Sequence, residues 1–164
     1  GLYHETVQIG FKYIAGKMVT EDVLLGGEES GGIATAGHIP ERDGIWMGLT
    51  LFEFMSKSNK SLEDLISEVY EIVGSFAFER IDLHIDNVTK INIIENCKLE
   101  KYTSFGKYKV QRIETIDGFK FFFDNDTWLM IRPSGTEPVL RTYAEAKTQD
   151  MAFDILAACK STIL

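Results

Sequence analysis

The chain has 164 residues, enough for one domain or for two small ones. With 25 acidic and 17 basic residues its formal net charge is −8, so we expect no nucleic-acid partner and no attraction to an anionic membrane. The apolar stretches are far shorter than a membrane span and none has the flanks of a secretory signal, so we expect neither a spanning helix nor export.

The first segment predicts the edge of an α/β layer. Val23–Leu25 reads as a short apolar strand that runs into the glycine-rich loop Gly26–Gly32, and we expect a helix to follow that loop. One such unit is too small to bury its own sheet. The chain also begins at Gly1, and its first methionine is Met18. We therefore expect residues 1–60 to be the end of a larger domain, in a piece of a longer protein or a processed chain.

The glycine-rich loop carries two carboxylates and one hydroxyl, on Glu28, Glu29 and Ser30. Carboxylates accept hydrogen bonds from adjacent sugar hydroxyls, and a serine hydroxyl can either donate or accept. The alternative is a flexible turn with solvated acids, which the loop alone favours. A second polar loop follows, in which His38 can donate a hydrogen bond or transfer a proton and Arg42 can attract an anion. A surface loop with Arg42 paired to a neighbouring acid is an equal alternative.

Two helices come next. Asp43 can cap a helix whose apolar residues share one face, and Ser61 with Asp64 resembles a capping box before a second helix that ends at Gly74. Residues 61–74 are thus predicted to link residues 1–60 to a separate domain over residues 75–164. The apolar positions of the two helices are Ile45, Leu49, Phe52, Met55, Leu62, Leu65, Ile66, Val69, Tyr70 and Val73.

After Gly74 the apolar period changes from that of a helix to that of a strand. Strands are predicted at 78–85, 108–116, 119–123, 128–132 and 139–146, with a weakly signalled helix over 88–97. Asp117-Gly118 is a strong hairpin signal, and Thr148 can cap a last helix. The fold class is therefore α+β: a partial α/β layer followed by a C-terminal domain with an antiparallel sheet covered by helices.

Residues 132–141, Arg-Pro-Ser-Gly-Thr-Glu-Pro-Val-Leu-Arg, carry the clearest chemistry. Arginines offer planar bidentate donors, hydroxyls offer adaptable ones, and a glycine allows the backbone to approach a ligand. Two prolines restrict the loop and preorganise these donors. The pattern predicts a site for an oxyanion, a phosphate monoester above all. The weaker alternative is a connector in which Arg141 pairs with Glu137 or Glu145.

Other candidate sites have simpler explanations. Asp124 and Asp126 fit a hairpin turn better than a metal site, because no further ligand follows at useful spacing. The aromatic residues of 119–123 fit a sheet and core better than a platform for bases. Cys97 and Cys159 show no metal spacing and no disulfide framework, which indicates buried thiols in a reducing cytoplasm.

Three motifs together resemble the α-D-phosphohexomutases, and most closely the phosphoglucomutase/phosphomannomutase branch. They are Gly27-Glu28-Glu29-Ser30-Gly31, then His38 with Arg42-Asp43-Gly44-Ile45, then residues 132–138 with Arg141. The resemblance covers the whole chain. It implies that residues 1–60 belong to the third of four domains and residues 75–164 to the fourth.

The resemblance also implies roles for single residues. Glu28 and Ser30 match positions that bind sugar hydroxyls, and the phosphate that is not being transferred is bound at positions matching Arg132, Ser134, Gly135, Thr136 and Arg141. His38 and Arg42 match positions that approach the substrate, and Arg42 stands where a lysine is frequent. Neither is assigned a definite catalytic task.

The implied reaction is the interconversion of hexose 1-phosphate and hexose 6-phosphate, in the cytoplasm, through a phosphoserine and a bisphosphorylated sugar, with Mg²⁺ neutralising charge. The sequence has no Ser-His-Asn-Pro stretch for the phosphoserine and no Asp-x-Asp-x-Asp-Arg stretch for Mg²⁺. We therefore expect no metal ligand and no activity in this chain alone, with the missing N-terminal domains as its partners. A phosphoglucosamine mutase and a non-catalytic sugar-phosphate binding module remain the alternatives.

Overall fold

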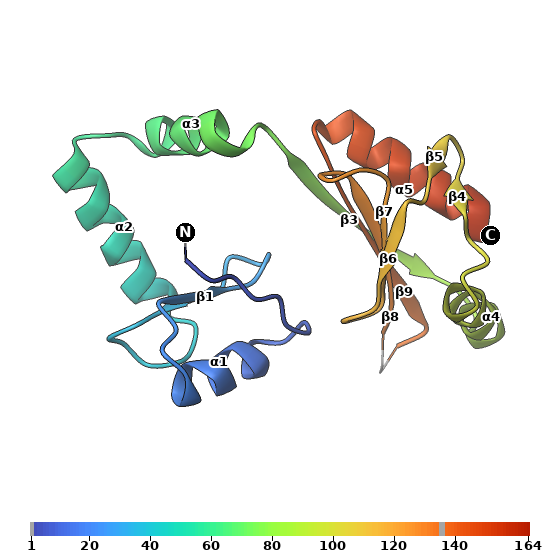
Figure 1. Ribbon diagram of the computed structural model, residues 1–164, viewed down its shortest axis with the longest axis horizontal. Coiled ribbons are helices and arrows are strands. Elements are labelled where there is room, and N and C mark those ends of the chain that lie inside the picture. The colour runs from blue at the N-terminus through green and yellow to red at the C-terminus, as the bar shows by residue number, and fades with distance from the viewer. Residues whose placement is uncertain (1, 135–136) are drawn as a thin grey trace. The chain divides into compact units, whose positions relative to one another are not determined.

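The structure, a computed structural model, describes residues 2–134 and 137–164 of the chain. The chain folds as two compact units, Gly1–Ile72 and Val73–Leu164 (Figure 1). Each unit has its own helices and strands.

The first unit combines helices with a two-stranded antiparallel hairpin (Figure 1). The first helix packs against the first strand, where the Ile14 side chain occupies the space that a Cβ on Gly26 would need. The elements of this unit are α1 (Phe11–Thr20), β1 (Leu25–Gly27), β2 (Ile33–Thr35), α2 (Gly44–Ser58) and α3 (Leu62–Val73).

The glycine-rich loop connects two strands, and the prediction that a helix follows it directly was wrong. Glu28 N–H donates to Gly32 O at 2.9 Å and Gly31 N–H donates to Glu28 O at 3.0 Å, which closes a tight turn between β1 and β2. The strand β2 is only three residues long, too short to show a period in the sequence.

The two helices α2 and α3 begin where the capping residues predicted. The Asp43 carboxylate accepts hydrogen bonds from the backbone N–H groups of Ile45 and Trp46. At the next helix Asp64 N–H donates to Ser61 Oγ at 3.1 Å, and Ser61 N–H donates to Asp64 Oδ2 at 3.0 Å. These reciprocal bonds are a capping box and confirm that prediction.

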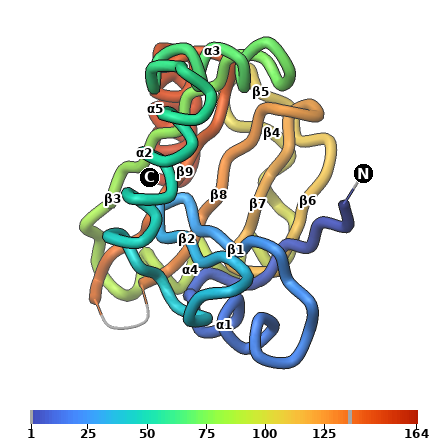
Figure 2. Tube along the Cα trace, turned by 90° about the vertical axis from the view of Figure 1, so that its left-hand side faces the viewer, coloured from blue at the N-terminus to red at the C-terminus, as the bar shows by residue number. Residues whose placement is uncertain are grey.

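The second unit is built on a five-stranded antiparallel sheet with the strand order β3-β9-β8-β7-β6, which Figure 2 shows side by side. The prediction of an α+β fold is confirmed. The elements of this unit are β3 (Ala77–His84), α4 (Asn87–Lys98), β4 (Ser104–Phe105), β5 (Tyr108–Lys109), β6 (Arg112–Glu114), β7 (Phe119–Phe122), β8 (Trp128–Pro133), β9 (Val139–Ala146) and α5 (Gln149–Ile163).

The strand predicted over 108–116 is in fact two strands in two different sheets. Val110 N–H donates to Thr103 O at 2.9 Å, whereas the next residue, Gln111, donates to Phe122 O at 2.8 Å. The chain thus changes its pairing partner from β4 to β7 between adjacent residues. An alternating pattern in the sequence cannot reveal such a change, because both halves keep the same period.

The core of the second unit lies between the inner face of the sheet and the helices α4 and α5. Successive side chains of a strand point to opposite faces, and on the inner face of β8 and β9 the residues Leu129, Ile131, Leu140 and Ala144 are fully buried. The outer face carries a smaller aromatic cluster around Trp128. The buried pattern therefore fixes which side chains of the β8–β9 hairpin point outward.

Replacing Leu129 with alanine should destabilise the second unit by about 2–5 kcal/mol, because it leaves a cavity in a closely packed core. Urea unfolding followed by circular dichroism measures this loss. The matched control is Leu99→Ala, since Leu99 is 63% exposed at the end of α4 and should change stability by less than about 0.5 kcal/mol. Equal losses in the two variants would contradict the assignment of the core.

Candidate functional site

Two arginines face each other across the β8–β9 hairpin. Arg132 and Arg141 are direct partners in the strand register. Directly opposed residues of an antiparallel pair point to the same face, with Cβ atoms about 4.5–5.5 Å apart, and like charges in that arrangement destabilise the sheet. The pair therefore creates a local positive charge that a bound anion would relieve.

Arg132 has a carboxylate partner within the protein. Its Nε donates to Asp117 Oδ1 at 3.0 Å, and both side chains are 23% exposed. Burial lowers the pKa of the Arg132 guanidinium, but Asp117, aided by Tyr143, outweighs that effect and raises the pKa above its ordinary value. Arg132 is therefore a fixed cation whose position depends on the turn between β6 and β7.

Among residues 2–134 and 137–164, Arg141 has no such partner. The sequence contains five arginines, and within the described residues the other four each contact a carboxylate: Arg42, Arg80, Arg112 and Arg132. Arg141 Nε is buried and has no hydrogen-bond acceptor among residues 2–134 and 137–164.

The acid that faces Arg141 is already engaged. Asp82 lies directly opposite Arg141 on β3, but its two oxygens accept hydrogen bonds from Arg80 at 2.7 and 2.6 Å. These bonds, and to a smaller extent the charge of Arg141, lower the pKa of Asp82. A buried charged donor without an acceptor is costly unless a ligand supplies one.

Hydrogen bonds at both ends hold the loop that joins β8 to β9. Ser134 N–H donates to Val139 O at 2.9 Å, and Ser134 Oγ accepts from Glu137 N–H at 3.3 Å. Lys90 Nζ, on α4, donates to Glu137 O at 3.0 Å. Ser134 is buried, and within the described part of the chain its hydroxyl accepts from Glu137 but donates to no acceptor. Gly135 and Thr136 lie outside the described residues, so their predicted roles stay predictions.

In the first unit, Glu28 is tied to Arg42. Arg42 Nη1 lies 3.2 Å from Glu28 Oε2, and Arg42 Nε lies 3.2 Å from Glu41 Oε1. The aliphatic part of Arg42 occupies the space beside Gly32 that a Cβ would fill, and its guanidinium sits 5.2 Å from the centre of the Phe11 ring. The structure thus brings together two of the predicted residues, Glu28 and Arg42.

Ser30 lies exposed in the turn between β1 and β2, two residues after Glu28. The Glu28 side chain is only 12% exposed, whereas the Arg42 side chain is 51% exposed. A carboxylate has about four acceptor sites, so the contact with Arg42 leaves Glu28 able to accept from a ligand hydroxyl. This loop therefore offers one buried acceptor and one exposed hydroxyl.

His38 is held by two neighbours from the start of α2. Its Nε2 lies 2.9 Å from Asp43 Oδ2, and its ring stacks on Trp46 with centroids 4.4 Å apart and planes 11° apart. The pKa of Asp43 is lowered, chiefly by the N–H of Trp46 and next by His38. His38 is thus oriented by a carboxylate, which is an arrangement suited to proton transfer or to a fixed hydrogen bond.

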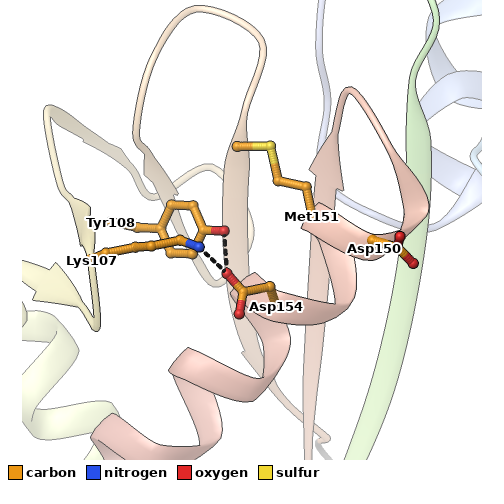
Figure 3. A pocket seen from close by; sticks show the side chains of 5 residues that line it. All are labelled: Lys107, Tyr108, Asp150, Met151 and Asp154. Atoms are coloured by element: carbon orange, nitrogen blue, oxygen red, sulfur yellow. Dashed lines mark hydrogen bonds and ion pairs between the residues drawn. The ribbon is translucent and has the colours of Figure 1, made fainter.

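A separate surface hollow of about 360 Å³ lies beside the first turns of α5 (Figure 3). Asp154 accepts a hydrogen bond from Tyr108 Oη at 2.6 Å and contacts Lys107 Nζ at 2.7 Å (Figure 3). Because Lys107 is already neutralised by Asp154, we do not assign this hollow to an anion.

The described residues include no cluster of three His, Cys, Asp or Glu side chains arranged as metal ligands. Within the same residues, none of the helices combines the length and the apolar character that a transmembrane segment requires. Cys97 and Cys159 are buried free thiols, and burial raises the pKa of each to about 12.

Some residues of the site were not recognised from the sequence. Asp117 was interpreted only as part of a turn and Asp43 only as a helix cap, yet each also binds a candidate residue. Lys90 and Trp46 carried no signal. For Asp117 a signal was available. It lies in the turn just before β7, and β7 pairs with β8, so this turn comes close to Arg132 near the end of β8.

Two family models match this chain in succession. The model for phosphoglucomutase/phosphomannomutase, alpha/beta/alpha domain III, matches residues 1–73. The model for the phosphoglucomutase/phosphomannomutase C-terminal domain matches residues 91–159. The two matches together leave out only short stretches of the chain.

Individual relatives agree with these models. A phosphoglucomutase/phosphomannomutase of Thermococcus kodakarensis is 30% identical over 91% of this chain and 30% of its own length. A phosphoglucosamine mutase of Methanocaldococcus jannaschii is 32% identical over 91% of this chain and 31% of its own length. A crystal structure assigned as a phosphomannomutase of Thermus thermophilus matches with a TM-score of 0.72 and 27% identity, covering 94% of this chain and 30% of that one. The chain thus spans about 30% of the length of these relatives.

Removing the imidazole in His38→Ala should raise the pKa of Asp43 toward its ordinary value. The contact with His38 lowers the pKa of Asp43, and the variant loses it; the N–H of Trp46, the larger cause, remains, so the rise should be partial. Carboxyl ¹³C shifts recorded during an acid titration measure the change. Asp64, whose pKa is lowered by Ser61, is the internal control and should not move. An unchanged Asp43 titration would contradict the contact.

Proposed function

The chain belongs to the phosphoglucomutase/phosphomannomutase family, and on that premise we propose that it supplies the substrate-binding groups of a phosphohexomutase. The longer protein would interconvert hexose 1-phosphate and hexose 6-phosphate through a phosphoserine and a bisphosphorylated sugar. In this proposal the β8–β9 hairpin binds the phosphate that is not being transferred, and the loop with Glu28 and Ser30 binds sugar hydroxyls.

The phosphate assignment depends on Arg141 Nε, which is buried and has no acceptor within the part of the chain that the structure describes. A phosphate monoester is a dianion at neutral pH with several acceptor oxygens, and guanidiniums recognise it by paired hydrogen bonds. It would supply the acceptor that Arg141 Nε does not find among the described residues, and it would neutralise the excess positive charge of the facing Arg132 and Arg141. Ser134 would add a hydroxyl donor at the base of the same loop. These groups would contact the phosphate and not the sugar ring. The site could then accept the phosphate at either end of a bisphosphorylated sugar, as the proposed reaction requires.

The proposed role of the first unit depends on Glu28. A carboxylate that is mostly buried and still has acceptor capacity can accept hydrogen bonds from adjacent hydroxyls of a hexose, and the exposed Ser30 hydroxyl can adapt to either role. Arg42 and His38 would lie near the substrate, Arg42 by fixing Glu28 and His38 as a group oriented by Asp43.

Magnesium is proposed only for the longer protein. The described residues do not bring together side chains suited to hold it, so its ligands would come from the other domains of that protein. The proposed reaction would take place in the cytoplasm, and the proposed partners of the chain are the hexose phosphate and the domains that carry the phosphoserine.

A glucosamine phosphate is the second candidate substrate. The observation that favours it is the identity of 32% with the phosphoglucosamine mutase of Methanocaldococcus jannaschii, close to the 30% found with the Thermococcus kodakarensis relative. The phosphate contacts on β8 and β9 would serve either substrate, so the choice would depend on groups that contact the sugar.

Replacing Arg141 with alanine should abolish binding of inorganic phosphate to this chain. A ¹H–¹⁵N titration of the unsubstituted chain should show shifts centred on residues 132–141, and the variant should show none there. Losing one partner of a desolvated charged contact costs on the order of 2–5 kcal/mol. Arg112→Ala is the matched control, because Arg112 is exposed and already paired with Glu114. Unchanged binding in Arg141→Ala would contradict the phosphate assignment.

This chain by itself should not convert glucose 1-phosphate into glucose 6-phosphate. Its 164 residues hold no Ser-His-Asn-Pro stretch and no Asp-x-Asp-x-Asp-Arg stretch, so the group that would donate the phosphoryl is missing. A coupled assay for glucose 6-phosphate measures turnover, with a complete phosphoglucomutase as the positive control. Turnover above the uncatalysed background would refute the proposed division of roles.

A further inference from the structure

We propose that the Asp117-Gly118 turn is the positioning element of the phosphate site, and that it orients Arg132 for the ligand. This inference rests on the proposed function, because it concerns the same phosphate site. Asp117 would not touch the phosphate. It would act through the guanidinium, which it binds at Nε.

The first support is the geometry of the contact. Asp117 lies 15 positions before Arg132, at the turn between β6 and β7, and its Oδ1 accepts from Arg132 Nε at 3.0 Å. A guanidinium is planar, so a bond at Nε fixes the plane in which both Nη groups lie. Those terminal nitrogens form the fork that matches two oxygens of a phosphate. A carboxylate at Nε therefore sets the direction of the fork.

The second support is the backbone of Gly118. Its φ is +69°, and a Cβ at this position would lie 2.7 Å from Ile131 O and 3.2 Å from Arg132 Cβ. A side chain would therefore push the turn away from β8 and widen the distance between Asp117 and Arg132. The close approach of the turn to Arg132 requires glycine for two independent reasons.

The third support is the contrast between the facing arginines. Arg132 is bound by an internal carboxylate, whereas the described residues offer no acceptor to Arg141 Nε. One guanidinium is thus fixed before the ligand arrives, and the other gains its acceptor with the ligand. Fixing a long side chain in advance lowers the entropy that binding must remove.

A positioning role and a purely electrostatic role of Asp117 predict opposite changes in phosphate affinity when Asp117 is replaced with alanine. Asp117 is an anion close to a proposed anion site, so by charge alone Asp117→Ala should strengthen phosphate binding. If Asp117 orients Arg132, the same substitution should weaken binding by about threefold to tenfold, since one long side chain is released. Asp117→Asn should keep binding near the original level, because an amide oxygen can still accept from Arg132 Nε.

The experiment titrates inorganic phosphate into the 164-residue chain and its variants, and it also follows the Arg132 Nε–H resonance. That resonance, assigned by its loss in Arg132→Lys, should exchange slowly in the unsubstituted chain and in Asp117→Asn, but rapidly in Asp117→Ala. Asp126→Ala is the matched control, because it removes a carboxylate from the turn between β7 and β8, at the opposite end of both strands.

The outcomes separate the two proposals. Weaker phosphate binding and fast Nε–H exchange in Asp117→Ala support the inference, provided that Asp126→Ala keeps the phosphate affinity and the slow exchange of the unsubstituted chain. Equal or tighter binding in Asp117→Ala overturns the inference and leaves the phosphate site intact. An Arg132 Nε–H that exchanges rapidly in the unsubstituted chain also overturns it. Absence of phosphate binding to the unsubstituted chain refutes the proposed function, and the inference with it.

Discussion

The register that places Arg132 opposite Arg141 is the constraint on which the candidate site depends. Two like charges in that position oppose folding, so the rest of the second unit must hold the two strands together. The inner face does so: Ile131 and Leu140 are fully buried against α4 and α5. A slip of one residue would turn the arginines into the core and the apolar residues outward. Core packing and ligand chemistry therefore select the same register.

The two candidate loops differ in whether their charged group already has a partner within the described protein. Glu28 is an acceptor held by a cation, so the Glu28–Arg42 contact is satisfied before any ligand arrives. Arg141 is a donor whose acceptor is missing among the described residues. A ligand that bound at Glu28 would share an existing contact, whereas one that bound at Arg141 would complete a missing one. Under the proposed function, more of the free energy of binding would therefore come from the phosphate than from the sugar.

Short-range signals made most of the fold predictable from the sequence. Asp43, Ser61 and Thr148 cap helices through contacts within three residues of their own positions, and Asp117-Gly118 forms its hairpin turn locally. Pairings between distant residues were not predictable. The strand β2 and the change of partner between Val110 and Gln111 depend on hydrogen bonds to other segments, and no period in the local sequence encodes them. The same limit applies to the candidate site. Its residue types were recognised from the sequence, but their contacts were not, such as that of Lys90 with Glu137 O, 47 positions away.

Charge pairing explains how a chain with a net charge of −8 can offer a site to an anion. A negative protein repels phosphates at long range, and salt limits that effect to about 10 Å or less. Attraction must then come from cations whose charge is not cancelled nearby. Arg80 and Lys107 are each paired with a carboxylate at their own surface. Among the described residues of the β8–β9 hairpin, Arg132 contacts the carboxylate of Asp117, whereas the facing Arg141 forms no ion pair. The excess of one positive charge at this point, and not the average charge of the surface, is what favours a phosphate there.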